Sequence, residues 1–471
     1  MNILVVNGSP KGSASITLQT VLYLQKCFPQ HTFQYLHAGQ QIRMLEKDFT
    51  PAVQALEKVE LILFSYPVYT FLAPSQLHRF LELVKESGIS LAGKYATQIT
   101  TSKHFYDVTA HRYIQENCQD LGMRMIKGFS ADMEDLLRSQ GQKEAIAFFR
   151  YVLWCRKTES FEPPLAPRSL PVHKPVQVPK VMQQEEGTER SRDKKDQKAG
   201  SRKAYKVVIV TDAREEDTQL RRMIARFQAV FPYESRIVNI REYPLAGGCL
   251  GCFHCAATGK CIYRDGFDEF LRGDIQSADG TVYAFSIQDH SMGAVFKKYD
   301  DRQFCNGHRT VTMGSPVGYL VSGNYSEEEN LRMILEGRSE VGGNFLAGVA
   351  TDEHDPDGDI DRLSRTLAYA LRHHYAQPKN FYGVGGMKIF RDLIFLMQGM
   401  MRADHRFFKE NGQYDFPQKQ PGTILKMYLV GTLMASPAVQ KKIGNQLTEG
   451  MLAPYRKILE EDKGDGRKKQ K

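Results

Sequence analysis

The chain has 471 residues, of which 42% are hydrophobic and 25% are charged, and its formal net charge is +9. This length exceeds that of one ordinary domain and the composition excludes a disordered chain, so we expect two or three globular domains. No run of about eighteen uncharged apolar residues occurs, which argues against a transmembrane helix. The N-terminus has neither a basic region nor a small-residue cleavage site, so we expect no signal peptide and predict a cytoplasmic protein.

Three predicted strands follow one another in the first part of the chain, two of them continuous apolar runs and the third rich in β-branched residues. They are "NILVVNGS", "VELILFSYPVY" and "YATQITTS", and helical patterns such as "APSQLHRFLELVKES" lie between them. Uninterrupted apolar strands that alternate with helices are typical of a parallel sheet buried on both faces. The sequence therefore predicts a doubly wound α/β domain over residues 1–155.

A change of composition predicts a linker over residues 156–204. Prolines cluster at its start, and a basic run follows in which Arg190 to Lys206 carries eight Lys or Arg against two Asp. Pro-rich and highly charged segments are extended or disordered. We interpret the charge as a solvated surface, so no specific nucleic-acid partner is expected.

Residues 205–377 repeat the pattern of the first domain. The stretches "AYKVVIVTDA", "SRIVNI", "TVYAFSIQ" and "PVGYLVSG" predict strands, and "EENLRMILEGRSEVGG" and "IDRLSRTLAYALRHHY" predict helices. We infer a diverged duplication, and hence two tandem parallel-sheet domains. The acidic stretch from Asp352 resembles a calcium loop, but Ile360 stands where an EF-hand needs glycine. We expect instead a turn whose Asp355 caps the following helix.

The last region, residues 378–471, is predicted to be a helical appendage. Phe390, Ile394, Met397 and Met401 recur at helical spacing. We expect these side chains to cover apolar surface within the chain or across a dimer, which leaves a homo-oligomer open. Peripheral membrane contact is the alternative.

A loop rich in hydroxyl groups joins the first strand to the first helix. The loop, "NGSPKGSASIT" from Asn7 to Thr17, contains neither the P-loop pattern nor a GxGxxG fingerprint. Backbone N–H groups, hydroxyls, Lys11 and the helix dipole would together suit a phosphate. The alternative is a simple Gly/Ser turn with a serine cap.

Together with "SYPVYTFLAPSQLHRFLE", this loop resembles the NADPH-dependent FMN reductase family of the flavodoxin-like superfamily. The resemblance implies a flavodoxin-like fold, an FMN cofactor and NAD(P)H as a transient substrate. It also implies three sets of FMN-binding residues. They are Ser9, Lys11, Ser13, Ser15 and Thr17 at the phosphate, Pro67, Val68 and Tyr69 at the flavin ring, and Thr101 and Ser102 in a third loop.

The second domain contains a cysteine-rich stretch, "CLGCFHCAATGKC", with the spacing C-x2-C-x2-C-x5-C. It resembles the compact cysteine motif of iron–sulfur flavoproteins, which implies a 4Fe–4S cluster on Cys249, Cys252, Cys255 and Cys261. A zinc site, a redox-active dithiol and cysteines without metal remain alternatives. The other cysteines, Cys27, Cys118, Cys155 and Cys305, are scattered, and we assign them no role.

Each domain has only one of the two predicted binding motifs, the hydroxyl-rich loop or the cysteine motif. Glu215, Glu216 and Asp217 replace the hydroxyl-rich loop in the second domain, where their charges would repel a phosphate, so we predict no ordinary FMN site there. The first domain has no cysteine motif. By resemblance we expect a fused pseudo-dimer in which the flavin of residues 1–155 faces the cluster of residues 205–377.

The predicted function is an FMN-dependent, NAD(P)H-linked oxidoreductase that passes electrons between a flavin and a 4Fe–4S cluster. No general acid or base is evident, and the cofactor itself carries flavin chemistry, so no catalytic residue is assigned. A small molecule or a protein would accept the electrons. The alternatives are a non-catalytic electron carrier or redox sensor, and a degenerate tandem with structural zinc.

Overall fold

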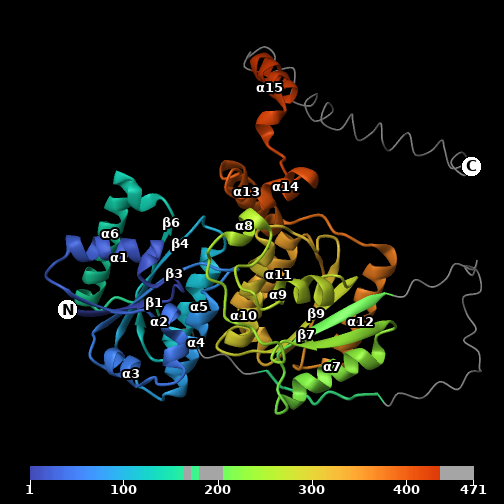
Figure 1. The fold of residues 1–471 in the computed structure, drawn as a ribbon, viewed down its shortest axis with the longest axis horizontal. Coiled ribbons are helices and arrows are strands. Elements are labelled where there is room, and N and C mark those ends of the chain that lie inside the picture. The colour runs from blue at the N-terminus through green and yellow to red at the C-terminus, as the bar shows by residue number, and fades with distance from the viewer. Residues whose placement is uncertain (164–170, 180–204, 435–471) are drawn as a thin grey trace, which may run out of the picture. The chain divides into compact units, whose positions relative to one another are not determined.

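A computed structural model describes residues 1–163, 171–179 and 205–434. Met1–Phe408 forms one compact unit and the chain from Lys409 onward forms another. The first unit contains two parallel β-sheets (Figure 1), and we call the parts built on them the first half and the second half. The predicted α/β fold, with two flavodoxin-like sheets followed by C-terminal helices, is confirmed.

The first sheet has the strand order β2-β1-β3-β4-β5, with β6 paired to the far end of β4. This is the 2-1-3-4-5 order of doubly wound flavodoxin-like sheets. Its strands are β1 (Asn2–Asn7), β2 (Thr32–Leu36), β3 (Leu61–Pro67), β4 (Tyr95–Ser102), β5 (Arg124–Met125) and β6 (Phe129–Asp132). Its helices are α1 (Ile16–Cys27), α2 (Ala38–Leu45), α3 (Thr50–Glu57), α4 (Ser75–Glu86), α5 (Asp107–Asp120) and α6 (Ser139–Thr158).

Alternate residues of the central strands face the two helical layers of this half. Val5 and Leu63 pack with α1 and α6, whereas Val6 and Phe64 pack with α2 to α5. Because both faces are covered, β1 and β3 are apolar at most positions, and every residue of β4 is buried although several are polar. This explains why the sequence shows continuous rather than alternating apolar runs.

The second sheet repeats the order, as β8-β7-β9-β10-β11. Its strands are β7 (Lys206–Thr211), β8 (Glu234–Asn239), β9 (Gly280–Ser286), β10 (Pro316–Ser322) and β11 (Phe345–Thr351). The helices α7 (Thr218–Val230) and α12 (Pro356–His373) cover one face, and α10 (Gly293–Arg302) and α11 (Glu329–Gly342) cover the other. Two short helices, α8 (His254–Thr258) and α9 (Phe267–Phe270), lie between β8 and β9.

The two halves pack through equivalent helices, α4 and α10, and their apolar side chains belong to one core. Each helix caps the other. Asp301 of α10 accepts a hydrogen bond from the Ser75 N–H at 2.8 Å, and Glu82 of α4 accepts one from the Ala294 N–H at 2.7 Å. This reciprocity is what a fused pair of related domains would show. The domain limits at residues 155 and 205 nevertheless stay predictions.

Part of the predicted linker is ordered along the second half. In residues 171–179, His173 lies 3.0 Å from Asp352, and Val176 is buried in the core beside α7 and α12. The first residues of the predicted linker, 156–158, belong to α6, which extends to Thr158. Residues 164–170 and 180–204, with most of the basic run, lie outside the described residues. The acidic turn before α12 behaves as expected, because Asp355 accepts a hydrogen bond from the Gly358 N–H. The cap assignment is therefore confirmed.

The C-terminal region is helical as far as the structure describes it. Its helices are α13 (Phe381–Leu396), α14 (Arg402–Glu410) and α15 (Pro421–Met434). The apolar stripe includes Ile394 and Met401, which are buried, and Phe390, which packs against the main core. In the second unit, Leu425, Tyr428 and Leu429 of α15 are exposed. None of the described helices combines the length and the apolar character needed to cross a membrane.

Candidate functional site

The loop after β1 is closed by the side chain of Asn7. Asn7 Nδ2 donates to the Gly12 carbonyl at 2.8 Å, and Asn7 Oδ1 accepts from the Ser9 N–H at 3.1 Å. This folding buries the residues Ser9, Ser15 and Thr17 at the start of α1. The result is a compact turn whose hydroxyl groups gather at the carboxyl end of the first sheet, where α/β proteins bind ligands.

The loops after β3 and β4 complete this edge. Thr17 and Thr101 share a buried hydrogen bond of 2.6 Å between their hydroxyls, which ties the first loop to the third. The second loop makes a tight turn in which the backbones of Tyr69 and Leu72 exchange two hydrogen bonds. Thr70 and Phe71 both have positive φ there, as in a type I′ turn.

The second half holds this turn in place. Lys297 is fully buried, and its Nζ donates to the Tyr69 carbonyl at 2.9 Å while it pairs with Asp301. Asp301 also accepts from the Thr70 hydroxyl at 3.1 Å. The loop that would line the flavin is therefore positioned by charged groups of the second half.

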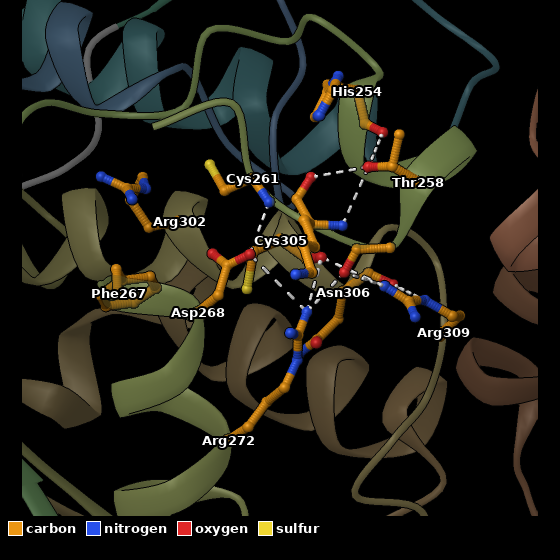
Figure 2. Close-up of polar contacts among 12 residues, drawn as sticks. His254, Thr258, Cys261, Phe267, Asp268, Arg272, Arg302, Cys305, Asn306 and Arg309 are labelled. Carbon is orange, nitrogen blue, oxygen red and sulfur yellow. Dashed lines mark hydrogen bonds and ion pairs between the residues drawn. The ribbon is translucent and has the colours of Figure 1, made fainter. Parts of the chain in front are cut away.

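The cysteine loop lies between β8 and β9, and polar contacts to its backbone fix its shape (Figure 2). Arg272 donates to the Gly259 carbonyl at 2.7 Å, and Asp268 accepts from the Cys261 N–H at 2.6 Å. Arg309 donates to the same Gly259 carbonyl at 3.4 Å. Because side chains outside the motif hold its backbone, the thiols are left available for a ligand.

Arg302 anchors the beginning of the same loop. It makes a two-pronged pair with Asp265, with both N–O distances at 2.8 Å, and donates to the Gly247 carbonyl at 3.0 Å. Burial acts against the charge of Asp265, but the hydrogen bonds from Arg302 and the Ala246 N–H bring its pKa to about 2. The pair is thus ionised, and it places a positive charge beside the cysteines.

Burial keeps two of the motif thiols protonated in the absence of a metal. It raises the pKa of Cys255 to about 12 and the pKa of Cys249 well above its ordinary value. A reactive dithiol needs the opposite shift, so these two cysteines do not fit that alternative. Metal coordination would deprotonate them, and the Gly251 N–H already lies 3.4 Å from Cys249 Sγ.

One cavity brings these loops together. Of the residues predicted to bind FMN, nine line it: Ser9, Lys11, Ser15, Thr17, Pro67, Val68, Tyr69, Thr101 and Ser102. All four motif cysteines, Cys249, Cys252, Cys255 and Cys261, line it too. Gly251 comes so close to Tyr69 that a Cβ on it would stand 1.9 Å from the tyrosine hydroxyl oxygen, and its φ of +60° also favours glycine.

Two residues differ from the sequence interpretation. Ser13 is exposed and does not line the cavity, because the short 3-10 turn Gly12–Ala14 turns it outward. Cys305, to which we assigned no role, is buried and lines the cavity with the motif cysteines. A single cysteine far along the chain from the motif carries no spacing signal, so sequence reasoning could not have found it.

The equivalent loop of the second half offers nothing comparable. Glu215 and Glu216 are exposed, and burial raises the pKa of Asp212 to about 6. None of these acidic residues lines the cavity described above. The absence of an ordinary FMN site in the second half stays a prediction.

Parts of the chain resemble known proteins. Residues 1–145 match the model of a family described by its flavodoxin-like fold. The match covers the first half of the chain and does not extend to the cysteine motif. An iron–sulfur flavoprotein of Archaeoglobus fulgidus is 27% identical over 173 residues, which are 35% of this chain and 78% of the relative. An iron–sulfur flavoprotein of Clostridioides difficile is 32% identical over 54 residues, which are 12% of this chain and 24% of the relative.

Among solved structures, an NAD(P)H:quinone oxidoreductase of Methanothermobacter marburgensis aligns with a TM-score of 0.28 at 10% identity, covering 33% of this chain and 96% of that one. The sequence matches confirm the resemblance to iron–sulfur flavoproteins that the motifs indicate. The cavity also fits such cofactors chemically. No carboxylate lies among its described lining residues, whereas Lys11, Lys103 and Arg302 do. A phosphate and a thiolate-bound cluster both favour nearby cations, although Lys103 is already paired with Asp132 and Glu134, and Arg302 with Asp265.

Proposed function

We propose that the protein is an FMN-dependent, NAD(P)H-linked oxidoreductase of the iron–sulfur flavoprotein type. FMN would bind the first half, and a 4Fe–4S cluster would bind Cys249, Cys252, Cys255 and Cys261 of the second half. The observation that carries the proposal is the shared cavity, which is lined both by the hydroxyl-rich loops and by all four cysteines. When bound, FMN would accept hydride from NAD(P)H and exchange electrons with the cluster.

The residues of the first half would bind and orient the cofactor. Ser9, Ser15 and Thr17 are buried around the start of α1, where hydroxyls and the helix dipole favour a phosphate. Lys11 lies with its Nζ 6.0 Å from the centre of the Phe253 ring, so it bridges the two halves at the cavity wall. Tyr69 would lie between the flavin and the cysteine loop, which it already contacts at Gly251.

Purification without oxygen, followed by assays of flavin, iron, sulfide and zinc, tests the proposal directly. We expect one FMN and four iron atoms per chain, with matching sulfide, in a brown protein. Zinc without sulfide, or protein with neither flavin nor iron, would contradict it. Rapid mixing with NADH or NADPH should then bleach the flavin band first and the broad cluster absorbance afterwards.

Paired variants separate the two binding sites. Cys252→Ser should lose the iron and keep the flavin, while the exposed thiol Cys27, replaced in Cys27→Ser, serves as the matched control. Ser15→Ala should weaken FMN binding roughly 10- to 100-fold, because one charge-assisted hydrogen bond contributes about 1.5–3 kcal/mol. Ser13→Ala removes the same kind of hydroxyl on the outer side of the turn, away from the cavity, and should leave FMN binding unchanged. Equal effects of the two serine variants would refute the phosphate assignment.

A further inference from the structure

A second group of ligand-forming side chains lies where the two halves meet. Each of three residues, Glu116, His290 and Glu328, offers one ligand atom, and these three atoms lie within 4.8 Å of one another. Glu116 comes from the C-terminal part of α5, His290 from the turn after β9, and Glu328 from the residue that precedes α11. None of the three lines the cysteine cavity. They form an independent cluster.

One oxygen in this cluster is unsatisfied. Glu116 is 5% exposed, and its Oε1 accepts a hydrogen bond from Arg112 at 2.7 Å. Its Oε2 is buried and has no hydrogen-bond partner among the described residues. A buried carboxylate oxygen without a donor costs free energy, so its environment calls for a proton donor or a cation.

The charges around the cluster do not balance. His290 Nδ1 lies 2.9 Å from Glu328, and its Nε2 lies 2.9 Å from Asp120. Lys85 pairs with Asp120 and with Asp289, and Arg112 pairs with Glu116. Four carboxylates thus share two permanent cations, Lys85 and Arg112. Both nitrogens of His290 face a carboxylate, so the imidazole is protonated when no metal is bound and one negative charge remains in excess. Displacing that proton would raise the excess to two. A divalent cation would neutralise that excess.

We propose that Glu116, His290 and Glu328 bind a divalent first-row transition-metal ion of the Mn²⁺ class. One imidazole with two carboxylates suits such an ion better than Ca²⁺ or Mg²⁺, which prefer oxygen ligands alone. Glu328 and His290 are partly accessible, with exposed side-chain fractions of 11% and 23%, so the ion has a route in. Because Glu116 belongs to the first half and the other two ligands to the second, the bound ion would link the halves.

Mn²⁺ is the appropriate probe because it binds oxygen and nitrogen ligands and is a poor match for the cysteine thiols. The full-length protein, with whatever cofactors it retains, is titrated with Mn²⁺, and free Mn²⁺ is followed by electron paramagnetic resonance. We expect one bound Mn²⁺ per chain. Failure to bind Mn²⁺ at about millimolar concentration would overturn the proposal and leave a simple ion-pair cluster.

Three variants assign the ligands. Glu116→Gln, His290→Gln and Glu328→Gln should each weaken Mn²⁺ binding roughly tenfold or more, since even outer-shell changes have effects of that size. Glu329→Gln is the matched control, because Glu329 is the exposed neighbour of Glu328 outside the cluster. Binding that is unchanged in the three variants, or weakened equally in the control, would refute the site.

A stability measurement provides the second readout. Mn²⁺ that binds only the folded chain should raise the melting temperature of the wild type as its concentration increases. The same addition of Mn²⁺ should leave the melting temperature of His290→Gln unchanged. Because the His290 side chain is more exposed than that of Glu328, this substitution should impair folding least. If Glu116→Gln fails to fold, His290→Gln and Glu328→Gln still decide between a metal site and an ion-pair cluster. A rise of equal size in the wild type and in these variants would contradict the proposal.

Discussion

Two turns occupy the same position in the two halves. Tyr69–Leu72 follows β3, and Gln288–Ser291 follows β9. In each, the outer residues exchange two backbone hydrogen bonds of 2.8–3.0 Å. In each, both central residues have positive φ, 44° and 71° in the first turn and 52° and 63° in the second. The backbone of the duplicated unit has therefore been kept in detail.

The side chains at the two turns have opposite character. Phe71 packs on Tyr106, the residue that precedes α5, with ring centres 4.1 Å apart. His290 occupies the same place in its turn and pairs with Glu328, the residue that precedes α11. An aromatic contact in one half thus corresponds to an ionic contact in the other. Equivalent positions of the two halves thus share their backbone geometry but differ in side-chain chemistry.

The largest effect is expected from removing Lys297 of the second half, which holds the turn Tyr69–Leu72 of the first half. Lys297→Met would leave Asp301 buried without its cation, and we expect the free energy of unfolding to fall by about 3–5 kcal/mol. Urea denaturation measures this loss, and FMN binding should weaken as well because Tyr69 loses its Lys297 contact. Lys26→Met, at an exposed position of α1, is the control. The interpretation fails if both lysine variants behave alike.

A smaller effect should follow from removing the hydroxyl bridge of the first loop. Thr17→Val leaves the buried Thr101 hydroxyl without its partner, which should destabilise the protein by about 1–3 kcal/mol. Thr218 begins α7 in the second half and is exposed, so Thr218→Val should change stability by less than about 0.5 kcal/mol. Thermal unfolding of the two variants without cofactor makes the comparison. Similar losses would show that the two loops are not as different as their side chains indicate.

The reciprocal caps between α4 and α10 offer a symmetric test. Glu82→Ala removes the acceptor of the Ala294 N–H, and loss of such a cap should cost about 0.5–2 kcal/mol. Asp301→Ala removes the equivalent acceptor of the Ser75 N–H but also strands Lys297, so its cost should be larger. Denaturation of both variants shows whether the difference has that sign. A larger loss in Glu82→Ala would mean that the contact of Glu82 with Ala294, rather than the contact of Asp301 with Ser75, stabilises the two helices more.

Sequence reasoning succeeded where the signal is local. The buried strands β1, β3, β4, β7, β9 and β10 are continuous apolar runs, and the first loop and the cysteine motif are short segments with a definite spacing. The strand β11 was missed because its sequence, "FLAGVAT", contains a glycine and its first residues are only partly buried. Neither positive-φ turn contains Asn-Gly or Asp-Gly, the usual signal for that geometry, so neither could be predicted.

Contacts between the halves had no sequence signal at all. Glu116 and His290 are separated by 174 positions, and Lys297 and Tyr69 by 228. The packing of α4 on α10 and of α5 on α11 brings them together. The prediction that flavin loops and cysteines meet came from resemblance to a family rather than from periodicity. The buried Cys305 shows the limit of that route, because the family motif does not include it.

The last expected effect is a pH slope in the loop that lacks the phosphate-binding pattern. Burial raises the pKa of Asp212 to about 6, although Arg241 lies 3.2 Å from its carboxylate and acts in the other direction. A carboxyl group whose pKa is raised in the folded state binds its proton more tightly there than in the unfolded chain, where the pKa is about 3.9. Its contribution to stability is therefore fully present below about pH 4 and is lost as the pH rises to about 6.

Asp212→Asn should remove this slope. The difference in unfolding free energy between variant and wild type should change in favour of the variant from pH 4 to pH 6 and stay level above that range. Gly8 stands at the corresponding position of the first half, and its neighbour Ser9 has no ionisable group, so Ser9→Ala should show no such slope. Denaturation at several pH values measures both differences. A difference for Asp212→Asn that does not vary with pH would mean that Arg241, rather than burial, decides the charge of this loop.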